Sequence, residues 1–323
     1  GGGGSDVVQG DTGDDRLWGD GPLTVASAGQ GADGQVLSLI APQGAAGSEI
    51  EVSGFVGREA AGMAETNIVY VVDVSHSMKL PFGSGTVGDL NGNGTPDEGM
   101  DALIASFEAL NALIADAGPT GANVTVIPFA STATAGITGT VDRGVEAYLR
   151  SLTTMGTTSF EAALTEAVRV LSGAVGEDNR VFFVSDGEHD VDSFLDAAIA
   201  LRDPQGIDAT IRAVGLGSDA ALADLDLIDD GVINGSVQRA DDPAALTAAL
   251  TASAVPLSQV ARLEILVNGT IRQTLLPAEL RETPFGLRFD AVLTRMTPDA
   301  PDRIEARLVT ATGATVTSQV TLQ

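Results

Sequence analysis

Residues 67–254 alternate strand-like apolar runs with stretches of helical periodicity, and this alternation constrains the fold more than any other feature. The first run, residues 68–72, is apolar throughout, as expected of a strand buried on both faces. Strands that alternate with helices are typical of a parallel sheet covered by helices. We therefore predict an α/β domain with a doubly wound, Rossmann-like sheet at residues 67–254. Further strands are expected at 124–129, 181–184, 207–216 and 232–238, and helices at 101–117, 160–171, 191–201, 220–228 and 243–252.

The segments on either side of this domain have β-type composition. Residues 23–66 contain short strand-like runs separated by Gly and Pro, and residues 255–323 continue with strands about ten residues apart. Asn268-Gly269 is a hairpin signal. The pattern predicts an Ig-like β-sandwich. Either both segments form one sandwich into which the α/β domain is inserted, or residues 23–66 are a separate linker sheet.

The composition is strongly acidic, with 44 Asp and Glu against 17 Lys and Arg and a net charge of −27. This charge argues against nucleic acid and against anionic membrane surfaces, and suits a protein that binds cations or works in salty water. The sequence has no cysteine, which excludes thiolate enzymes, disulfide scaffolds and zinc–thiolate sites. It opens on four glycines without a Met and has no apolar run long enough to span a bilayer, so we expect a segment of a longer protein.

Residues 1–22 follow a nine-residue period. Each unit begins with a Gly-rich turn and carries Asp at its sixth place, at Asp6 and Asp15. The pattern resembles the nonapeptide repeats of RTX (repeats-in-toxin) proteins, which implies calcium held between stacked turns. Asp11 and Asp20 stand where that pattern usually has a second Gly. The alternative is a flexible Gly/Asp linker, and two repeats are too few to stack into a stable roll.

The strongest functional signal is Asp73-x-Ser75-x-Ser77, directly after the first buried strand. Ligands of open α/β sheets bind beyond the carboxyl ends of the strands. By the same rule, the loops at residues 155–159 and 185–187 are expected at the same edge. Carboxylate and hydroxyl oxygens are hard ligands, which suit magnesium, manganese or calcium rather than zinc.

These three loops resemble the metal-ion-dependent adhesion site (MIDAS) of the von Willebrand factor A (VWA) domain, in the family's order. The resemblance covers about residues 66–254. It implies direct ligation of a metal by Ser75, Ser77 and a Thr, and an open position for a partner's carboxylate. Asp73 and Asp186 would act directly or through water.

The threonine is assigned by counting back from Ala163-Leu164, which makes Thr158 the metal residue and Thr157 its neighbour. Thr157 and His76 stand where the family commonly has Gly, but neither is a ligand place, so the metal interpretation holds. The alternative is a doubly wound sheet whose site no longer binds metal.

A second cluster, residues 89–98, has oxygen side chains at its first, third, fifth and ninth positions and Gly at its sixth. That is the spacing of an EF-hand-type calcium loop. The twelfth place is Met100 rather than Glu, and no helix is expected before the loop. A shortened loop, as in dockerin-like or thrombospondin-like repeats, fits better and resembles loops in VWA domains of bacterial RTX adhesins. The alternative is a polar turn. The candidate ligands are Asp89, Asn91, Asn93, Thr95 and Asp97.

These features predict a non-enzymatic, cation-dependent adhesion module of a large bacterial RTX-type protein, secreted or at the cell surface and exported by type I secretion. The sequence contains no nucleophile elbow, phosphate loop or metalloprotease motif. Expected partners are a protein or glycan that presents a carboxylate, and the neighbouring domains of the longer chain. Expected cofactors are Mg²⁺ or Ca²⁺, with Mn²⁺ as a third candidate, at the MIDAS, and Ca²⁺ at loop 89–97 and at the repeats. The alternatives are an assembly segment that bridges neighbouring domains and a regulatory subunit of an ATPase machine.

Overall fold

The structure is a computed structural model, and it describes residues 24–31, 35–42, 49–57, 66–117, 122–140, 143–174, 177–187, 194–253, 255–294 and 302–322. The chain divides into two compact units. The α/β unit comprises Gly57–Pro256 and Arg281–Arg288, and the β unit comprises Gly1–Val56, Leu257–Leu280 and Phe289–Gln323. The predicted RTX-like repeats, with Asp6 and Asp15, lie outside the described residues.

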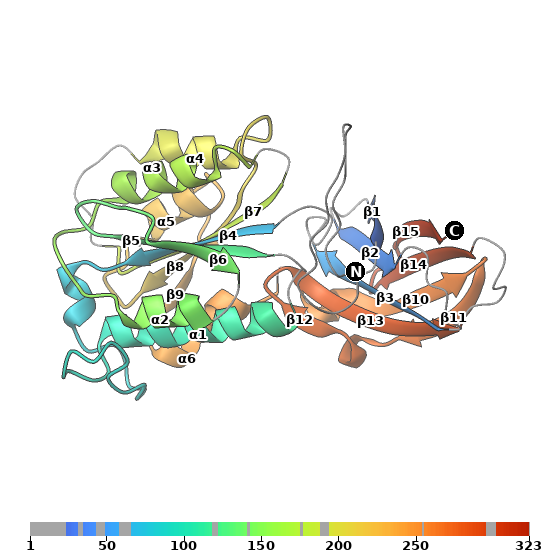
Figure 1. Cartoon of the computed structure of the whole chain (residues 1–323), viewed down its shortest axis with the longest axis horizontal. Coiled ribbons are helices and arrows are strands. Elements are labelled where there is room, and N and C mark those ends of the chain that lie inside the picture. Colours follow the sequence, from blue (N-terminus) through green and yellow to red (C-terminus); the bar gives the residue numbers. More distant parts are fainter. Residues whose placement is uncertain are drawn as a thin grey trace, which may run out of the picture. The chain divides into compact units, whose positions relative to one another are not determined.

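A six-stranded sheet runs through the α/β unit in the order β6-β5-β4-β7-β8-β9 (Figure 1). Neighbouring strands are parallel except for β5 and β6, which are antiparallel. The predicted α/β fold is therefore confirmed, with a mixed sheet that has one antiparallel edge strand. The strands are β4 (Thr66–Asp73), β5 (Asn123–Phe129), β6 (Ile137–Thr140), β7 (Asp178–Ser185), β8 (Thr210–Leu216) and β9 (Gln238–Ala240).

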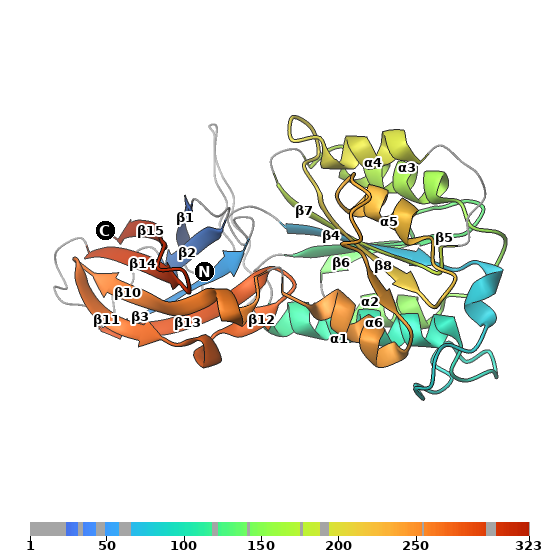
Figure 2. The same ribbon diagram turned by 180° about the vertical axis from the view of Figure 1, so that it is seen from behind.

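Helices cover both faces of this sheet (Figures 1 and 2). One face carries α1 (Gly99–Ala117), α2 (Arg143–Arg150) and α6 (Pro243–Thr251). The opposite face carries α3 (Phe160–Leu171), α4 (Leu195–Arg202) and α5 (Leu222–Asp229). Among the helices that the structure describes, none combines the length and the apolar character needed to cross a membrane.

β4 is buried on both faces, as its apolar run predicts. Side chains alternate between the two faces along a strand. Val71 belongs to the core cluster that includes Phe160 of α3 and Phe183 of β7. The neighbouring Tyr70 ring packs on the other face against Phe107 of α1, with ring centroids 4.6 Å apart. Because the helices occupy both faces, the loops at the ends of the strands are left to carry functional groups.

The predicted strand at residues 232–238 is wrong. Its first two residues are exposed, and the strand found there, β9, begins only at its last residue. The carboxylate of the buried Asp226 organises this segment by accepting backbone N–H groups from Asn234, Gly235 and Val237. A side chain that takes these amides competes with strand pairing, so the segment forms a turn.

The remaining strands form two sheets, in the orders β1-β2-β3-β13-β12 and β11-β10-β14-β15. β3, which precedes the α/β segment in the chain, lies next to β13, which follows it, and this favours the insertion arrangement. The hairpin predicted at Asn268-Gly269 is confirmed, with both residues at positive φ between β10 and β11. The Ig-like assignment stays a prediction. The elements are β1 (Thr24–Gln30), β2 (Val36–Pro42), β3 (Glu49–Gly57), η2 (Leu257–Gln259), β10 (Val260–Val267), β11 (Thr270–Leu275), η3 (Pro277–Glu279), β12 (Arg281–Thr283), β13 (Gly286–Thr294), β14 (Asp302–Thr310) and β15 (Thr315–Leu322).

Candidate metal centre

The loop after β4 and the loop before α3 are joined by backbone hydrogen bonds. Met155 N–H donates to Val74 O at 2.6 Å, and His76 N–H donates to Gly156 O at 3.2 Å. Val74 N–H also donates to Phe129 O, at the end of the neighbouring β5, at 2.8 Å. These bonds bring the first two predicted loops together at the carboxyl edge of the sheet.

Asp73 is the last residue of β4 and is fully buried. Its Oδ1 accepts the backbone N–H of Ser75 at 2.8 Å, which turns the chain so that Ser75 and Ser77 share one side of the loop. The hydroxyl oxygens of Ser75 and Ser77 are 2.9 Å apart and hydrogen-bonded to each other. Ser75 is buried and Ser77 half-buried, so the pair lies between the core and the rim. Ser77 lies in the short 3₁₀ helix η1 (His76–Lys79).

Ser185, the last residue of β7, connects the third loop to Asp73. Its hydroxyl donates to Asp73 Oδ2 at 2.5 Å, and its Oγ accepts the backbone N–H of Gly187 at 3.0 Å. Gly187 has a φ of +78°, and a Cβ there would stand 2.1 Å from the backbone nitrogen of Ala221. Only glycine fits this turn without moving the backbone. Ser185 itself does not stand out in the sequence. The signal available was a small polar residue that ends a buried apolar strand.

The carboxylates of Asp73 and Asp186 repel each other. Burial, and then the charge of Asp186, raises the pKa of Asp73 to about 7, although hydrogen bonds from Ser185 and Ser75 act in the opposite direction. Two carboxylates that repel in a buried site fit a divalent cation, because a bound cation offsets their repulsion.

Thr158 is buried while Thr157 is exposed. Ser159, which follows Thr158, is the N-cap of α3, and its side chain accepts the Ala162 N–H at 3.2 Å. This burial supports Thr158 over Thr157 as the metal residue, and the assignment of Thr158 stays a prediction.

The described part of the chain contains no group of three or more His, Cys, Asp or Glu side chains that could hold a metal. The site at the end of β4 is of another kind, since it combines two carboxylates with hydroxyls. Its oxygen donors are of the type that Mg²⁺, Ca²⁺ and Mn²⁺ prefer.

The residues of the predicted calcium loop accept hydrogen bonds from their own backbone. The two carboxylate oxygens of Asp89 accept the N–H groups of Asn93 and Gly94, at 3.0 and 2.9 Å. Asp97 Oδ1 accepts the N–H groups of Val87 and Gly88, at 2.6 and 2.9 Å. The side-chain oxygens of Asn91 and Asn93 accept the backbone N–H groups of Asn93 and Thr95 in the same way. This is the arrangement of a polar turn, and calcium binding by the loop stays a prediction.

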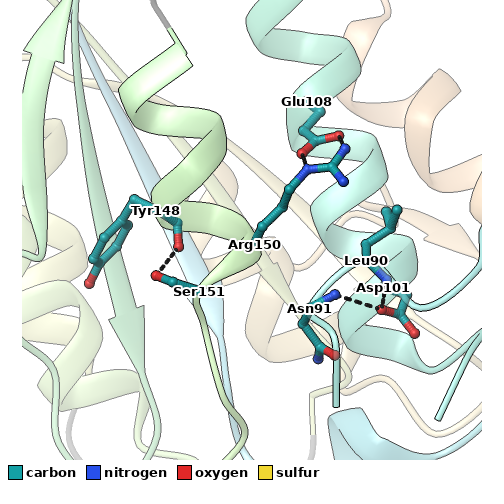
Figure 3. Close-up of polar contacts among 7 residues, drawn as sticks. All are labelled: Leu90, Asn91, Asp101, Glu108, Tyr148, Arg150 and Ser151. Atoms are coloured by element: carbon teal, nitrogen blue, oxygen red, sulfur yellow. Dashed lines mark hydrogen bonds and ion pairs between the residues drawn. The ribbon is translucent and has the colours of Figure 1, made fainter. Parts of the chain in front are cut away.

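Asp101 closes this loop, a role that the spacing of the loop residues does not predict. It lies in the first turn of α1 and is fully buried. Its Oδ1 accepts the N–H groups of Leu90 at 2.8 Å and Asn91 at 3.4 Å (Figure 3). Its Oδ2 accepts the N–H group of Glu98 at 3.1 Å. The acidic residue that follows the loop is thus one position beyond Met100.

Figure 3 also shows α2 joined to α1 by Arg150, whose guanidinium contacts Glu108 at 2.6 Å.

The family comparison agrees with this fold. Residues 68–189 match the model of the von Willebrand factor type A domain. The chain therefore contains a VWA domain, a general protein-interaction and adhesion module that typically binds a divalent metal at its MIDAS. No curated protein matches the chain.

Several solved structures are similar to parts of the chain. The pilus adhesin SpaC from Lactobacillus rhamnosus GG is 14% identical, with 87% of this chain and 47% of that chain covered and a TM-score of 0.45. The ArnB paralog VWA2 from Sulfolobus acidocaldarius is 14% identical, with coverage of 93% and 74% and a TM-score of 0.43. Proximal thread matrix protein 1 from the mussel byssus, described with a zinc-occupied MIDAS motif, is 17% identical, with coverage of 60% and 44% and a TM-score of 0.43. The chain thus spans less than half of the adhesin and of the byssus protein, and identities this low carry no information about function.

Proposed function

We propose that the VWA domain is a cation-dependent ligand-binding module without catalytic activity. Asp73, Ser75, Ser77, Thr158 and Asp186 hold a divalent cation, and a carboxylate of the partner completes its coordination. The observation that supports this is the pair of hydroxyls of Ser75 and Ser77, 2.9 Å apart beside the buried carboxylate of Asp73.

A series of hydrogen bonds holds the proposed ligands in place. Ser185 holds Asp73, and Asp73 in turn holds the backbone of Ser75 through its N–H. The two serines contribute neutral oxygens, so the site contains few negative charges for a dication. A hard dication surrounded mostly by hydroxyls and water keeps much of its positive charge and attracts an incoming carboxylate strongly. This gives a chain with a net charge of −27 a local positive spot for an acidic partner.

The setting that we propose is a large secreted or cell-surface bacterial protein of the RTX type. Mg²⁺ or Ca²⁺ occupies the MIDAS, and Ca²⁺ binds at loop 89–97 and at the repeats of residues 1–22. The partner is a protein or glycan with an accessible carboxylate. An acidic surface supports this setting, because extracellular fluids supply the calcium and salt that screen its self-repulsion.

Calorimetry with Mn²⁺ tests the metal site directly. We expect the full chain to bind Mn²⁺ and a Ser75→Ala/Ser77→Ala double variant to lose that binding. Ser151→Ala, an exposed serine after α2, is the matched control and should bind as the wild type does. All proteins in this comparison also carry Asp89→Ala, which removes any Mn²⁺ binding by loop 89–97. Retained binding in the folded double variant would contradict the proposal. A screen of protein and glycan arrays, run in magnesium and in chelator, then separates adhesion from the two alternatives, an assembly segment that bridges neighbouring domains and a regulatory subunit of an ATPase machine.

A further inference from the structure

A pocket of about 390 Å³ opens beside the candidate metal centre. Ser77 and Asp186, two of the proposed metal ligands, are among the residues that line it. The pocket therefore adjoins the place where a partner's carboxylate would bind. A residue next to that carboxylate in the partner is within reach of the pocket.

The walls of the pocket come from two segments that the fold holds in place. One consists of the residues that flank loop 89–98, where Gly99 N–H donates to Leu80 O at 2.9 Å. The other is the loop after β8, where Gly217 N–H donates to Ala240 O at 2.8 Å. A Cβ at Gly83, which also lines the pocket and has a φ of +64°, would stand 2.4 Å from the carbonyl oxygen of Asp241. The two walls are thus in backbone contact, and the pocket is part of the fold.

The lining combines apolar side chains with carboxylates. Met78 and Phe82 provide a buried apolar surface, and Leu80 stands 65% exposed at the rim. The acidic lining residues are Asp186, Asp219 and Asp241, and none of the described lining residues is Lys, Arg or His.

Arg239 lies outside this lining and pairs with Asp241, with its Nε 2.9 Å from Oδ1. Both of these side chains are about half exposed, so solvent screens their interaction. Asp186 belongs to the proposed metal site and Asp241 is paired with Arg239, so Asp219 provides the remaining negative charge of the lining. Long basic side chains match such a lining, since they bury a methylene stem along apolar surface and keep a charged head beside acidic groups.

We infer that this pocket receives an arginine or lysine side chain that neighbours the metal-bound carboxylate in a protein partner. The inference rests on the proposed function, because it takes the carboxylate at the metal as its point of attachment. It narrows the partner from any carboxylate-bearing molecule to a protein segment in which an acidic residue stands close to a basic one. Asp219 is the residue that we assign to the charged head.

The pocket is tested without metal by methyl NMR of the full chain in chelator, with n-butylguanidinium as the probe and neutral butyramide as its control. We expect saturable shifts at the methyl groups of Met78 and Leu80 with the cation and none with the amide. Asp219→Asn should weaken the cation about three- to fivefold. Asp196→Asn, which removes an exposed charge on α4, should leave it unchanged. Equal shifts with both probes, or an unchanged affinity in Asp219→Asn, would overturn the inference.

A pair of glycine-flanked peptides, Asp-Gly-Arg and Asp-Gly-citrulline, tests the link to the metal site in magnesium. We expect the arginine peptide to bind about tenfold more tightly, the effect of one hydrogen-bonded charge, and to lose that advantage in Asp219→Asn. Equal, chelator-sensitive affinities would overturn the pocket while the metal function stands. Specific binding of n-butylguanidinium together with peptide binding that ignores chelator would instead overturn the metal function.

Discussion

Ser185 donates a 2.5 Å hydrogen bond to Asp73, so the last residue of β7 fixes the last residue of the neighbouring β4. Both side chains are fully buried. The carboxylate is thereby held in the orientation in which its other oxygen accepts the Ser75 N–H. Ser185 is therefore a positioning residue for the candidate metal centre, although it is not among the proposed ligands.

Replacing Ser185 with Ala should weaken both the fold and the site. A buried carboxylate that loses a hydrogen bond costs about 1–3 kcal/mol, so the free energy of unfolding in chelator should fall by that amount. Residues that orient metal ligands typically change metal affinity by about 10- to 100-fold, and we expect Mn²⁺ affinity to fall within that range. Urea unfolding and calorimetry measure the two effects, with Ser151→Ala as the control. Wild-type Mn²⁺ affinity in Ser185→Ala would show that the hydrogen bond has no role in the site.

Replacing Asp73 with Asn should stabilise the metal-free protein at neutral and alkaline pH. The pKa of Asp73 is raised from 3.8 to about 7 by burial and by the charge of Asp186. The folded state therefore binds this proton more tightly than the unfolded chain does. As a result, this residue's contribution to stability falls as the pH rises from about 4 to about 7 and stays low above that.

Asn has no charge, so the variant avoids the free-energy cost of ionising a buried carboxylate at this position. At pH 8 in chelator we expect it to be more stable than the wild type by about 1–3 kcal/mol, with the difference shrinking toward pH 4. Excess Mg²⁺ should stabilise only the wild type. Urea unfolding at pH 4, 6 and 8 measures this, and a variant less stable than the wild type at pH 8 in chelator would contradict the raised pKa of Asp73.

Much of the α/β fold could be predicted because its signals are local. β4 is buried on both faces, so its sequence is apolar throughout, and it needs no partner to be recognised. β6 and α2 are short elements that are partly exposed, and they were not predicted. The segment before β9 contains apolar residues but forms a turn, because Asp226 accepts its amides from a distance in sequence. Local composition does not reveal that competition.

The candidate site also combines residues with a local sequence signal and residues that only the structure reveals. Asp73, Ser75 and Ser77 lie within five residues, so their spacing and the preceding strand were enough to suggest a metal loop. Ser185 and Asp101 act through contacts with residues remote in sequence or at the other end of a loop, and a single sequence does not show such pairings. Thr158 required a family resemblance, since two adjacent threonines are equivalent in chemistry and differ only in burial.

The two threonines give a matched pair of variants. Thr158→Ala should reduce Mn²⁺ affinity at least tenfold, because it removes a neutral oxygen from the proposed coordination sphere. Thr157→Ala removes the same atoms from an exposed side chain and should change the affinity less than twofold. Calorimetry in the Asp89→Ala background isolates the candidate metal centre at the end of β4. The reverse order of effects would move the metal residue to Thr157 and shift the register of the second loop by one.

The loop between η1 and α1 provides the last prediction, which separates calcium binding from structural support. Asp101 is buried and accepts three backbone N–H groups, so Asp101→Asn should lower the free energy of unfolding by about 1–3 kcal/mol even in chelator. Asp89 is exposed, and Asp89→Ala should cost less than about 1 kcal/mol there.

Calcium should increase the stability that Asp89→Ala loses relative to the wild type. A metal that binds only the folded state stabilises it by mass action, by about 2.7 kcal/mol at one hundred times its dissociation constant. The wild type should gain that stabilisation in calcium, and Asp89→Ala should lose most of it together with one bound calcium per chain, because Asp89 provides the first position of the loop. Thermal unfolding in calcium and in chelator, combined with calcium titration, measures both quantities. If Asp89→Ala keeps the wild-type stoichiometry and the wild-type gain in stability, the loop is a polar turn closed by Asp101 and does not bind calcium.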